Sequence, residues 1–541
     1  MTSKAVSWWQ KAIIYQIYPL SFCDSDGDGF GDLKGITSKL NYLKDLGVDV
    51  LWLSPIYKSP MDDNGYDISD YDSIDPIFGT MDDFNELLEA VHSRNQRLIM
   101  DLVINHTSDE HLWFLEARKS KDNPYRDFYI WRDEPSDITS VFSGSAWELD
   151  PLTNQYYFHL FSKKQPDLNW DNPLLRQEIY KMINRWLDLG IDGFRLDVID
   201  LIGKDVEHKQ LGDGPFLNER LDELNKACFE GRDIMTVGEM PGVSIKRTID
   251  ITDLKHSKLN MVFQFGHLWL DEMPGEGKWA LKPLDLLEFK RFFKNIQNGL
   301  YQKGWNSLFL SNHDQPRAVS RYGNLIYRKE SAKMLATMIY SMQGTPYVYQ
   351  GEELGMTGIK LRNIGDYRDI ETLNMYKEYL DKGWPIEKVM ASIYAKGRDN
   401  SRTPMQWNAS MNAGFSKGKP WLKVNPNYRQ INTELDRVDH TGVYRYFKRL
   451  FELRKRLPIF DSGDFTLIEE ENRDHFSYVR KSGDESIVVI CSFKDQPIEL
   501  DLSQYQNHVC LLSNYPSVAL TDKTQLDPYY AGIYYAGQMK L

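Results

Sequence analysis

Eight short runs of apolar and β-branched residues recur along the first two-thirds of the chain, and stretches with helical spacing separate most of them. The runs span residues 12–19, 48–56, 97–106, 191–199, 233–240, 259–265, 307–314 and 345–351. Continuous apolar runs are typical of parallel strands that are covered on both faces. Eight alternations of strand and helix predict a closed (β/α)8 barrel, the TIM barrel; a doubly wound open sheet is the alternative.

Two of the intervening helices carry start signals. Thr80 can cap a helix over residues 81–92, with Asp83 in its first turn. Pro173 opens another helix, because proline fits the first helical position. The apolar stripe expected on this second helix consists of Leu175, Ile179, Met182, Ile183, Trp186 and Leu189.

The alternation breaks after the third run. The stretch up to residue 171 is rich in Trp, Tyr, Pro and Asp and is far longer than an ordinary connection, which predicts an inserted subdomain. A second irregular stretch, 358–425, follows the eighth run, and a helix-like segment covers 443–456. Short strands with polar turns then predict a C-terminal antiparallel β-domain, at 465–469, 475–480, 486–491, 498–502 and 508–512.

These patterns divide the chain into three parts. The barrel takes residues 1–104 and 172–463, the inserted subdomain takes 105–171, and a β-sandwich-like domain takes 464–541. The last part has about 75 residues, which is near the small end of domain sizes, since domains typically have roughly 50–250 residues.

Composition excludes several classes of partner. The formal net charge is −13 and there is no basic stripe, which argues against nucleic acid. The four cysteines lack disulfide-like or metal-ligand spacing, as expected in a reducing compartment. Residues 1–19 lack the apolar stretch of a signal peptide, and no run reaches the roughly 18 apolar residues of a membrane span. We therefore expect a cytoplasmic monomer with a small-molecule substrate and no membrane partner.

Ionisable side chains gather where the predicted strands end. In a TIM barrel the carboxyl ends of the strands form the active-site face. Clustered carboxylates repel one another unless a task holds them together, and glycoside hydrolysis and metal binding are the obvious tasks. The residues expected at this rim are Asp101, His106, Arg195, Asp197, Glu239, His313 and Asp314.

The segments that carry these residues resemble a known family. DLVINH (101–106), GFRLDVID (193–200), VGEMPG (237–242) and NHDQPR (312–317) are similar to the four signature segments of the α-amylase superfamily, glycoside hydrolase family 13. QPDLN (165–169) resembles the segment that marks the oligo-1,6-glucosidases and dextran glucosidases within it. The similarity runs from Trp8 to the C-terminus.

The resemblance implies a role for each matching residue. Asp197 would be the nucleophile that forms a glucosyl-enzyme, and Glu239 the general acid/base with a raised pKa. Asp314 would hold sugar hydroxyls, and Arg195 would keep Asp197 ionised. Asp101 would support the site without contacting substrate.

Further residues are implied to bind the first sugar. His106 and His313 would donate hydrogen bonds to it, while Asp63, Tyr66 and Arg398 would close the pocket around the non-reducing glucose. A closed pocket makes the enzyme exo-acting.

The residue after the nucleophile bears on linkage. Val198 resembles the valine that accompanies α-1,6 cleavage in the family, where Thr or Ala accompanies α-1,4 cleavage. A methyl-sized difference is worth only about 1–3 kcal/mol in a pocket. The expected activity is hydrolysis of α-1,6-glucosidic bonds in isomaltose, isomalto-oligosaccharides or short dextran.

Alternatives stay open at this point. They are an α-1,4-glucosidase acting on maltose, a trehalose-6-phosphate hydrolase, which would need a cationic phosphate pocket, and a non-catalytic amylase-like scaffold.

One position departs from the family pattern. Gly266, directly before His267, stands where relatives often carry glutamate.

A cation loop is predicted near the N-terminus. Carboxylates at mostly alternate positions between residues 24 and 32 resemble the first nine positions of a calcium loop, although Gly35 stands where an EF-hand has glutamate. The family resemblance points to the same ion, with a backbone carbonyl as an added ligand. The expected structural Ca²⁺ ligands are Asp24, Asp26, Asp28, Phe30 and Asp32.

Overall fold

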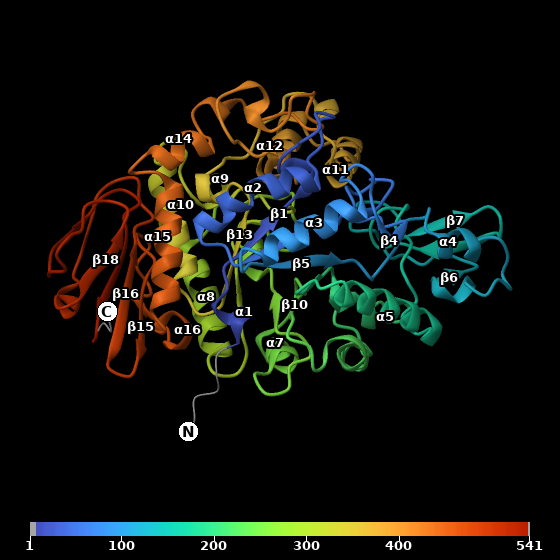
Figure 1. Ribbon diagram of the computed structural model, residues 1–541, viewed down its shortest axis with the longest axis horizontal. Helices are drawn as coiled ribbons and strands as arrows, with labels where there is room; N and C mark the ends of the chain where they lie inside the picture. Colours follow the sequence, from blue (N-terminus) through green and yellow to red (C-terminus); the bar gives the residue numbers. More distant parts are fainter. Residues whose placement is uncertain (1–6, 539–541) are drawn as a thin grey trace.

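The computed structural model describes residues 7–538 and has a ring of eight parallel strands at its centre (Figure 1). The strand order is β11-β10-β9-β5-β2-β1-β13-β12, and a parallel bridge between Val262 and Asn306 joins the two ends. The closed barrel is therefore confirmed over the open sheet. The strands are β1 (Ile14–Ile17), β2 (Val50–Leu53), β5 (Arg97–Leu102), β9 (Gly193–Leu196), β10 (Met235–Glu239), β11 (Met261–Phe263), β12 (Ser307–Leu308) and β13 (Thr345–Tyr349).

Helices surround the ring. They include α2 (Leu33–Leu46), α3 (Met81–His92), α5 (Pro173–Asp188), α6 (Leu217–Leu224), α7 (Ile245–Thr252), α8 (Leu286–Leu300), α10 (Arg328–Tyr340) and α15 (Val443–Arg456). The predicted cap of α3 is confirmed, because the Thr80 hydroxyl accepts a hydrogen bond from the Asp83 amide and the Asp83 carboxylate accepts one from the Thr80 amide. The predicted stripe of α5 is wrong at Leu189, which lies one residue beyond the helix and is 39% exposed.

Alternate strand residues enter two separate apolar clusters, as the period of a strand requires. Ile14 and Val50 belong to the cluster inside the ring, together with Trp52, Phe263 and Tyr347. Their strand neighbours, such as Leu51, Leu98 and Tyr15, belong to the larger cluster that includes the surrounding helices. The inner cluster fills the barrel below the site.

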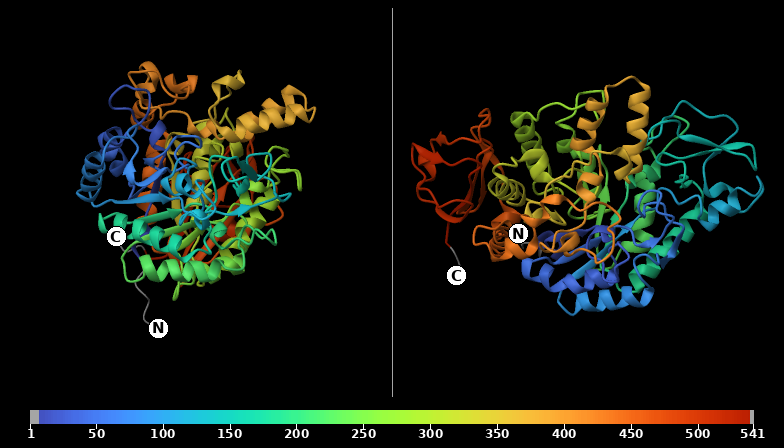
Figure 2. Two further views of the ribbon diagram at one scale, coloured as in Figure 1. Left: turned by 90° about the vertical axis from the view of Figure 1, so that its right-hand side faces the viewer. Right: turned by 90° about the horizontal axis from the view of Figure 1, so that it is seen from above.

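The segment after β5 forms its own layer at one end of the molecule (Figures 1 and 2). It contains α4 (Leu112–Ala117) and a small antiparallel sheet in the order β6 (Trp131–Arg132), β8 (Gln155–Phe158), β7 (Trp147–Asp150). The 358–425 stretch, predicted to be irregular, instead contains the helices α11 (Ile370–Asp381), α12 (Ile386–Lys396) and α13 (Asp399–Arg402).

A C-terminal antiparallel domain lies at the opposite end of the barrel (Figure 1). Its five-stranded sheet has the order β14 (Thr466–Ile468), β15 (Ser477–Ser482), β16 (Glu485–Cys491), β20 (Ala531–Ala536), β18 (Val509–Ser513). A second sheet pairs β17 (Ile498–Leu500) with β19 (Thr524–Leu526). The five predicted strands are present, but β19 and β20 were not predicted. Residues 1–6 and 539–541 of the predicted domain ranges lie outside the described residues.

Gly193 begins the strand that carries two of the predicted site residues, Arg195 and Asp197. Its φ is 142°, and a methyl group there would lie 1.8 Å from the Met235 carbonyl oxygen on β10. We expect Gly193→Ala to destabilise the protein by about 3 kcal/mol and to lower activity, because strand β9 has to move away from β10. Thermal unfolding and activity assays measure both effects.

The matched control is Gly365→Ala, where a methyl group meets nothing within 4 Å. Equal unfolding temperatures for the two variants would contradict this account of Gly193.

Candidate active site

Eight of the predicted site residues line one cavity of about 320 Å³ at the carboxyl ends of the strands. Asp197 directly follows β9, Glu239 is the last residue of β10, and Asp314 lies in the loop after β12. The shared cavity is lined by Asp63, Tyr66, His106, Asp197, Val198, Glu239, Asp314 and Arg398. Arg195 and His313 lie beneath this lining and are almost fully buried.

Arg195 connects the acidic side chains at the base of the cavity. One terminal nitrogen, Nη1, donates to Asp197 Oδ1 at 2.6 Å and to Asp101 Oδ1 at 2.8 Å. The other, Nη2, lies 2.7 Å from Glu239 Oε2. The Arg195 side chain is 1% exposed, so its charge is compensated entirely by protein groups.

The carboxyl groups of Asp197 and Glu239 are close together because they bind neighbouring nitrogens of this one guanidinium. Retaining glycosidases have a carboxyl separation of about 5–5.5 Å, whereas inverting enzymes leave about 6.5–9.5 Å for a water molecule. The shared guanidinium favours the retaining arrangement.

Burial raises the pKa of both Asp197 and Glu239 to about 7, and the Arg195 charge acts in the opposite direction on both. Burial also raises the pKa of Asp101 to about 6. Three carboxyl groups around one guanidinium therefore take up a proton near neutral pH. This is the state that a general acid beside an ionised nucleophile requires.

Asp314 differs from Asp197 and Glu239 because its pKa is lowered. Although burial opposes ionisation, the neighbouring His313, Arg402 and Arg398 hold the pKa of Asp314 well below its usual range. Arg402 Nη2 donates to Asp314 Oδ1 at 2.5 Å, and His313 Nε2 lies 3.0 Å from Oδ2. Asp314 thus stays anionic across the pH range in which Glu239 titrates.

An ion pair closes one side of the cavity. Arg398 Nη2 donates to Asp63 Oδ1 at 2.9 Å and also lies 2.6 Å from Asp369 Oδ1. Tyr66 donates to Asp101 Oδ2 at 3.0 Å and stacks on His313, with ring centroids 5.2 Å apart. Asp63 and Arg398, both predicted to close the pocket, are therefore in direct contact in the structure.

The two histidines already have protein partners. His106 Nε2 lies 3.1 Å from the Tyr66 carbonyl oxygen, and His313 Nδ1 lies 2.8 Å from Gln16 Nε2. Burial lowers the pKa of both imidazoles to about 4, so both are neutral near pH 7.

Several residues of the site were not identified from the sequence. The same cavity is lined by Phe142, Phe161, Asp200, Lys278 and Glu371. Lys278 Nζ donates to Glu371 Oε2 at 2.6 Å. Phe142 and Phe161 come from the inserted subdomain, Lys278 from a segment preceding α8 and Glu371 from α11, so no strand-end position marks these four. Asp200 lies in the turn just after β9.

The backbone of Val198 is strained. Its φ is 34° and its ψ is 46°, a left-handed conformation that is rare for a β-branched residue. In this conformation the Val198 amide donates to Glu239 Oε2 at 3.1 Å. Strain at such a position marks a functional constraint.

Gly266 has a packing reason to lack a side chain. A methyl group there would lie 2.4 Å from Cε2 of Phe292 on α8. The Phe292 ring thus occupies the space that a larger residue at 266 would need.

The aspartate loop brings three carboxylates together. One oxygen from each of Asp24, Asp26 and Asp28 lies within 4.8 Å of the others. Burial and the neighbouring acids raise the pKa of Asp28. The carboxylate oxygens of Asp32 accept from Ser25 N at 2.7 Å and from Gly35 N at 2.6 Å, and the latter contact caps α2.

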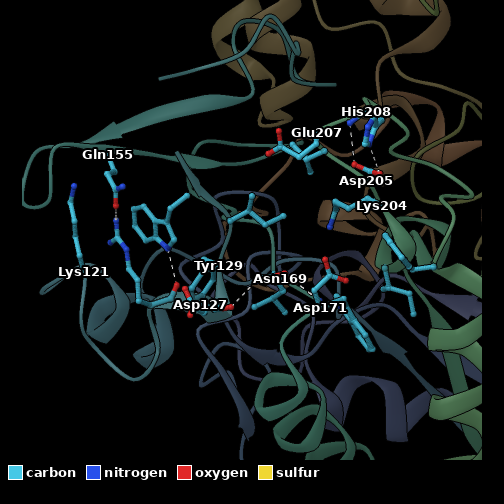
Figure 3. A pocket seen from close by; sticks show the side chains of 18 residues that line it. Lys121, Asp127, Tyr129, Gln155, Asn169, Asp171, Lys204, Asp205, Glu207 and His208 are labelled. Carbon is cyan, nitrogen blue, oxygen red and sulfur yellow. Dashed lines mark hydrogen bonds and ion pairs between the residues drawn. The ribbon is translucent and has the colours of Figure 1, made fainter. Parts of the chain in front are cut away.

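Another cavity, of about 650 Å³, lies between the inserted subdomain and the 202–216 loop (Figure 3). Its Trp131 is covered on one side by Arg126, 3.4 Å from the ring centroid, and stacks with Phe114. The Trp131 ring is therefore already engaged by protein side chains.

A TIM barrel with paired, proton-sharing carboxyl groups at its rim defines a glycoside hydrolase of the retaining type. The family model "Alpha amylase, catalytic domain" matches residues 16–463, and "Maltogenic Amylase, C-terminal domain" matches residues 465–533. The chain belongs to the alpha-amylase family, glycoside hydrolase family 13.

Individual relatives are similar over almost the full length. The chain is 53% identical to an oligo-1,6-glucosidase of Parageobacillus thermoglucosidasius, covering 97% of this chain and 98% of the relative. It is 49% identical to a glucan 1,6-alpha-glucosidase of Streptococcus pneumoniae, covering 97% and 98%. The solved structure of Bacillus licheniformis trehalose-6-phosphate hydrolase matches with a TM-score of 0.93 at 46% identity, covering 98% and 100%.

None of the helices within residues 7–538 combines the length and apolar character that a membrane crossing requires.

We expect kcat/KM to fall as the pH rises through about 7, because Glu239 then loses the proton that it delivers to the leaving oxygen. In Glu239→Gln, assayed with a nitrophenyl glucoside whose leaving group needs no proton, this alkaline fall should disappear. Activity measured as a function of pH tests this expectation.

Asp200→Asn is the control. Burial and the charge of Glu239 raise the pKa of Asp200 to about 7. Because the coupling is reciprocal, removing the Asp200 charge lowers the pKa of Glu239. This variant should therefore keep the alkaline fall in activity but shift it to lower pH. An alkaline fall that persists in Glu239→Gln would contradict the assignment.

Proposed function

We propose that this protein is a retaining, exo-acting α-glucosidase that hydrolyses α-1,6-glucosidic bonds at the non-reducing end of isomaltose, isomalto-oligosaccharides or short dextran. One observation carries the proposal: Asp197 and Glu239 bind a single buried guanidinium in a cavity that the Asp63–Arg398 pair closes. The cavity contains both catalytic groups, and the ion pair limits how far the sugar chain can extend beyond its non-reducing end.

The reaction follows from these positions. Asp197 attacks the anomeric carbon and forms a covalent β-glucosyl-enzyme, while Glu239 transfers its proton to the departing oxygen. Glu239 then takes a proton from water, which attacks the same carbon and releases glucose with its configuration retained. Asp314 stays anionic and holds sugar hydroxyls in the distorted transition state, and Arg195 favours the ionised form of Asp197.

Two observations support the α-1,6 linkage. Val198 lines the cavity directly beside the nucleophile, where its side chain limits the position of the leaving sugar. The oligo-1,6-glucosidase and glucan 1,6-alpha-glucosidase described above carry that linkage in their names.

Trehalose 6-phosphate is the second candidate substrate, because a trehalose-6-phosphate hydrolase shares the fold at 46% identity. A phosphate needs an available cation. Among the described lining residues, Lys278 is 2.6 Å from Glu371, and Arg398 contacts Asp63 and Asp369. Both cations are already compensated, which favours a neutral sugar.

We also propose a structural Ca²⁺ held by Asp24, Asp26 and Asp28, with the Phe30 carbonyl as a further ligand. Hard oxygen donors that converge from alternate positions suit this ion. Asp32, which also caps α2, is the remaining ligand that the sequence predicts. The ion would cancel the repulsion between the carboxylates.

We propose a cytoplasmic monomer. The four free cysteines, three of them buried, are compatible with a reducing compartment.

We expect faster glucose release from isomaltose than from maltose at equal concentration, measured with a glucose assay. Asp197→Asn should lower kcat by about 10⁴-fold or more, because the nucleophile is lost.

Val198→Thr should raise maltose activity relative to isomaltose by about tenfold. A preference of the unaltered enzyme for maltose would contradict the linkage alone, and preference for trehalose 6-phosphate would favour the second candidate.

Removing calcium with a chelator should lower the unfolding temperature and leave kcat nearly unchanged. A ligand at 100 times its Kd stabilises the folded state by about 2.7 kcal/mol. Differential scanning calorimetry with added Ca²⁺ or chelator measures the shift. In Asp28→Asn the response should largely disappear, whereas a chelator-insensitive unfolding temperature in the unaltered protein would rule the ion out.

A further inference from the structure

A second cavity, of about 770 Å³, lies against the active-site cavity, between the inserted subdomain and α11. Phe142 and Phe161 line both cavities. Their rings meet edge to face, with centroids 5.5 Å apart, and Phe142 is only 6% exposed. These two aromatic rings are therefore the partition between the cavities.

Phe142 lies on the side of the active-site cavity that is closed by the ion pair. The Arg398 guanidinium lies 4.8 Å from the centroid of the Phe142 ring, and the same guanidinium binds Asp63. In the proposed function, Asp63 and Arg398 hold the non-reducing glucose. Phe142 thus lies behind the terminal sugar, on the side away from the bond that is cut.

A contact with α11, on the side of the second cavity, holds the backbone of Phe142 in place. The Asn374 side-chain amide of α11 donates to the Phe142 carbonyl oxygen at 3.0 Å. Ser143 and Gly144, the next two residues, have φ of 77° and 83°. Two consecutive positive φ values turn the chain sharply after Phe142, and the surrounding structure must hold Ser143 in a conformation that a non-glycine residue rarely adopts. The ring is therefore held by a specific turn docked on α11.

The second cavity combines neutral hydrogen-bonding groups with charged ones. Its neutral lining includes the side chains of Ser145, Ser162, His159 and Asn374. Its charged lining consists of Asp62, Glu148, Lys163, Lys164, Lys377, Glu378, Asp381 and Lys382. Hydroxyl and amide groups of this kind can bind sugar hydroxyls. A glucan that continued past the first sugar would enter this space.

We propose that Phe142 is the specificity-determining residue that restricts this enzyme to chain ends, because its ring separates the active-site cavity from a preformed space for further glucose units. The proposal rests on the exo-glucosidase function above. It assigns the exo limit to the ring as well as to the Asp63–Arg398 pair.

The test is a product analysis with linear dextran. The unaltered enzyme should release glucose alone. In Phe142→Val and Phe142→Ala, isomaltose and longer products should rise at least about tenfold relative to glucose, with the larger rise in the alanine variant, because a steric barrier is removed. Phe142→Tyr, which keeps the ring, and Phe265→Ala, which truncates a ring lining only the active-site cavity, are the matched controls and should release glucose alone.

Early reaction products are separated by chromatography, and circular dichroism checks that each variant is folded. Glucose as the only product of folded Phe142→Val and Phe142→Ala, or loss of all activity in both, would overturn the proposal. Longer products from the Phe265→Ala control would overturn it as well, because the effect would not be specific to the partition. Failure of the unaltered enzyme to cut isomaltose would instead contradict the exo-glucosidase function itself.

Discussion

The buried guanidinium of Arg195 is the interaction on which the site depends. It is 1% exposed and contacts Asp101, Asp197 and Glu239, so removing it would leave several carboxyl groups buried together without a counter-charge. Strand register creates the contacts: Arg195 pairs with Asp101 on β5 and with Val237 on β10, two residues before Glu239. The backbone hydrogen bonds that join β5, β9 and β10 therefore set the geometry of the catalytic groups.

Much of this arrangement could be predicted from the sequence, because the barrel strands are continuous apolar runs and the acids stand at their ends. A parallel barrel brings all carboxyl ends to one rim, so strand-end positions such as Asp197 and Glu239 have to meet. The Thr80 cap of α3 and the Pro173 start of α5 depend on residues only a few positions apart, so they could also be predicted from the sequence.

The missed features depend on contacts between distant segments. β20 is an interior strand of its sheet, but its short Ala-Gly-Ile-Tyr-Tyr-Ala segment is recognisable as a strand only when β16 and β18 pair with it. Phe142 comes from the inserted subdomain and Glu371 from α11, and neither is marked by a strand end. The cap that Asp32 provides for α2 was not predicted, because the spacing of the aspartates pointed only to a cation ligand.

The contact between Gly266 and Phe292 constrains how this chain can diverge. Any side chain at 266 collides with a ring 26 positions away, and that ring is itself held beside His267 and Phe293. A change at 266 therefore requires the Phe292 ring to shift or position 292 to become smaller. The two positions are coupled, so the effect of a carboxylate at 266 depends on which residue stands at 292.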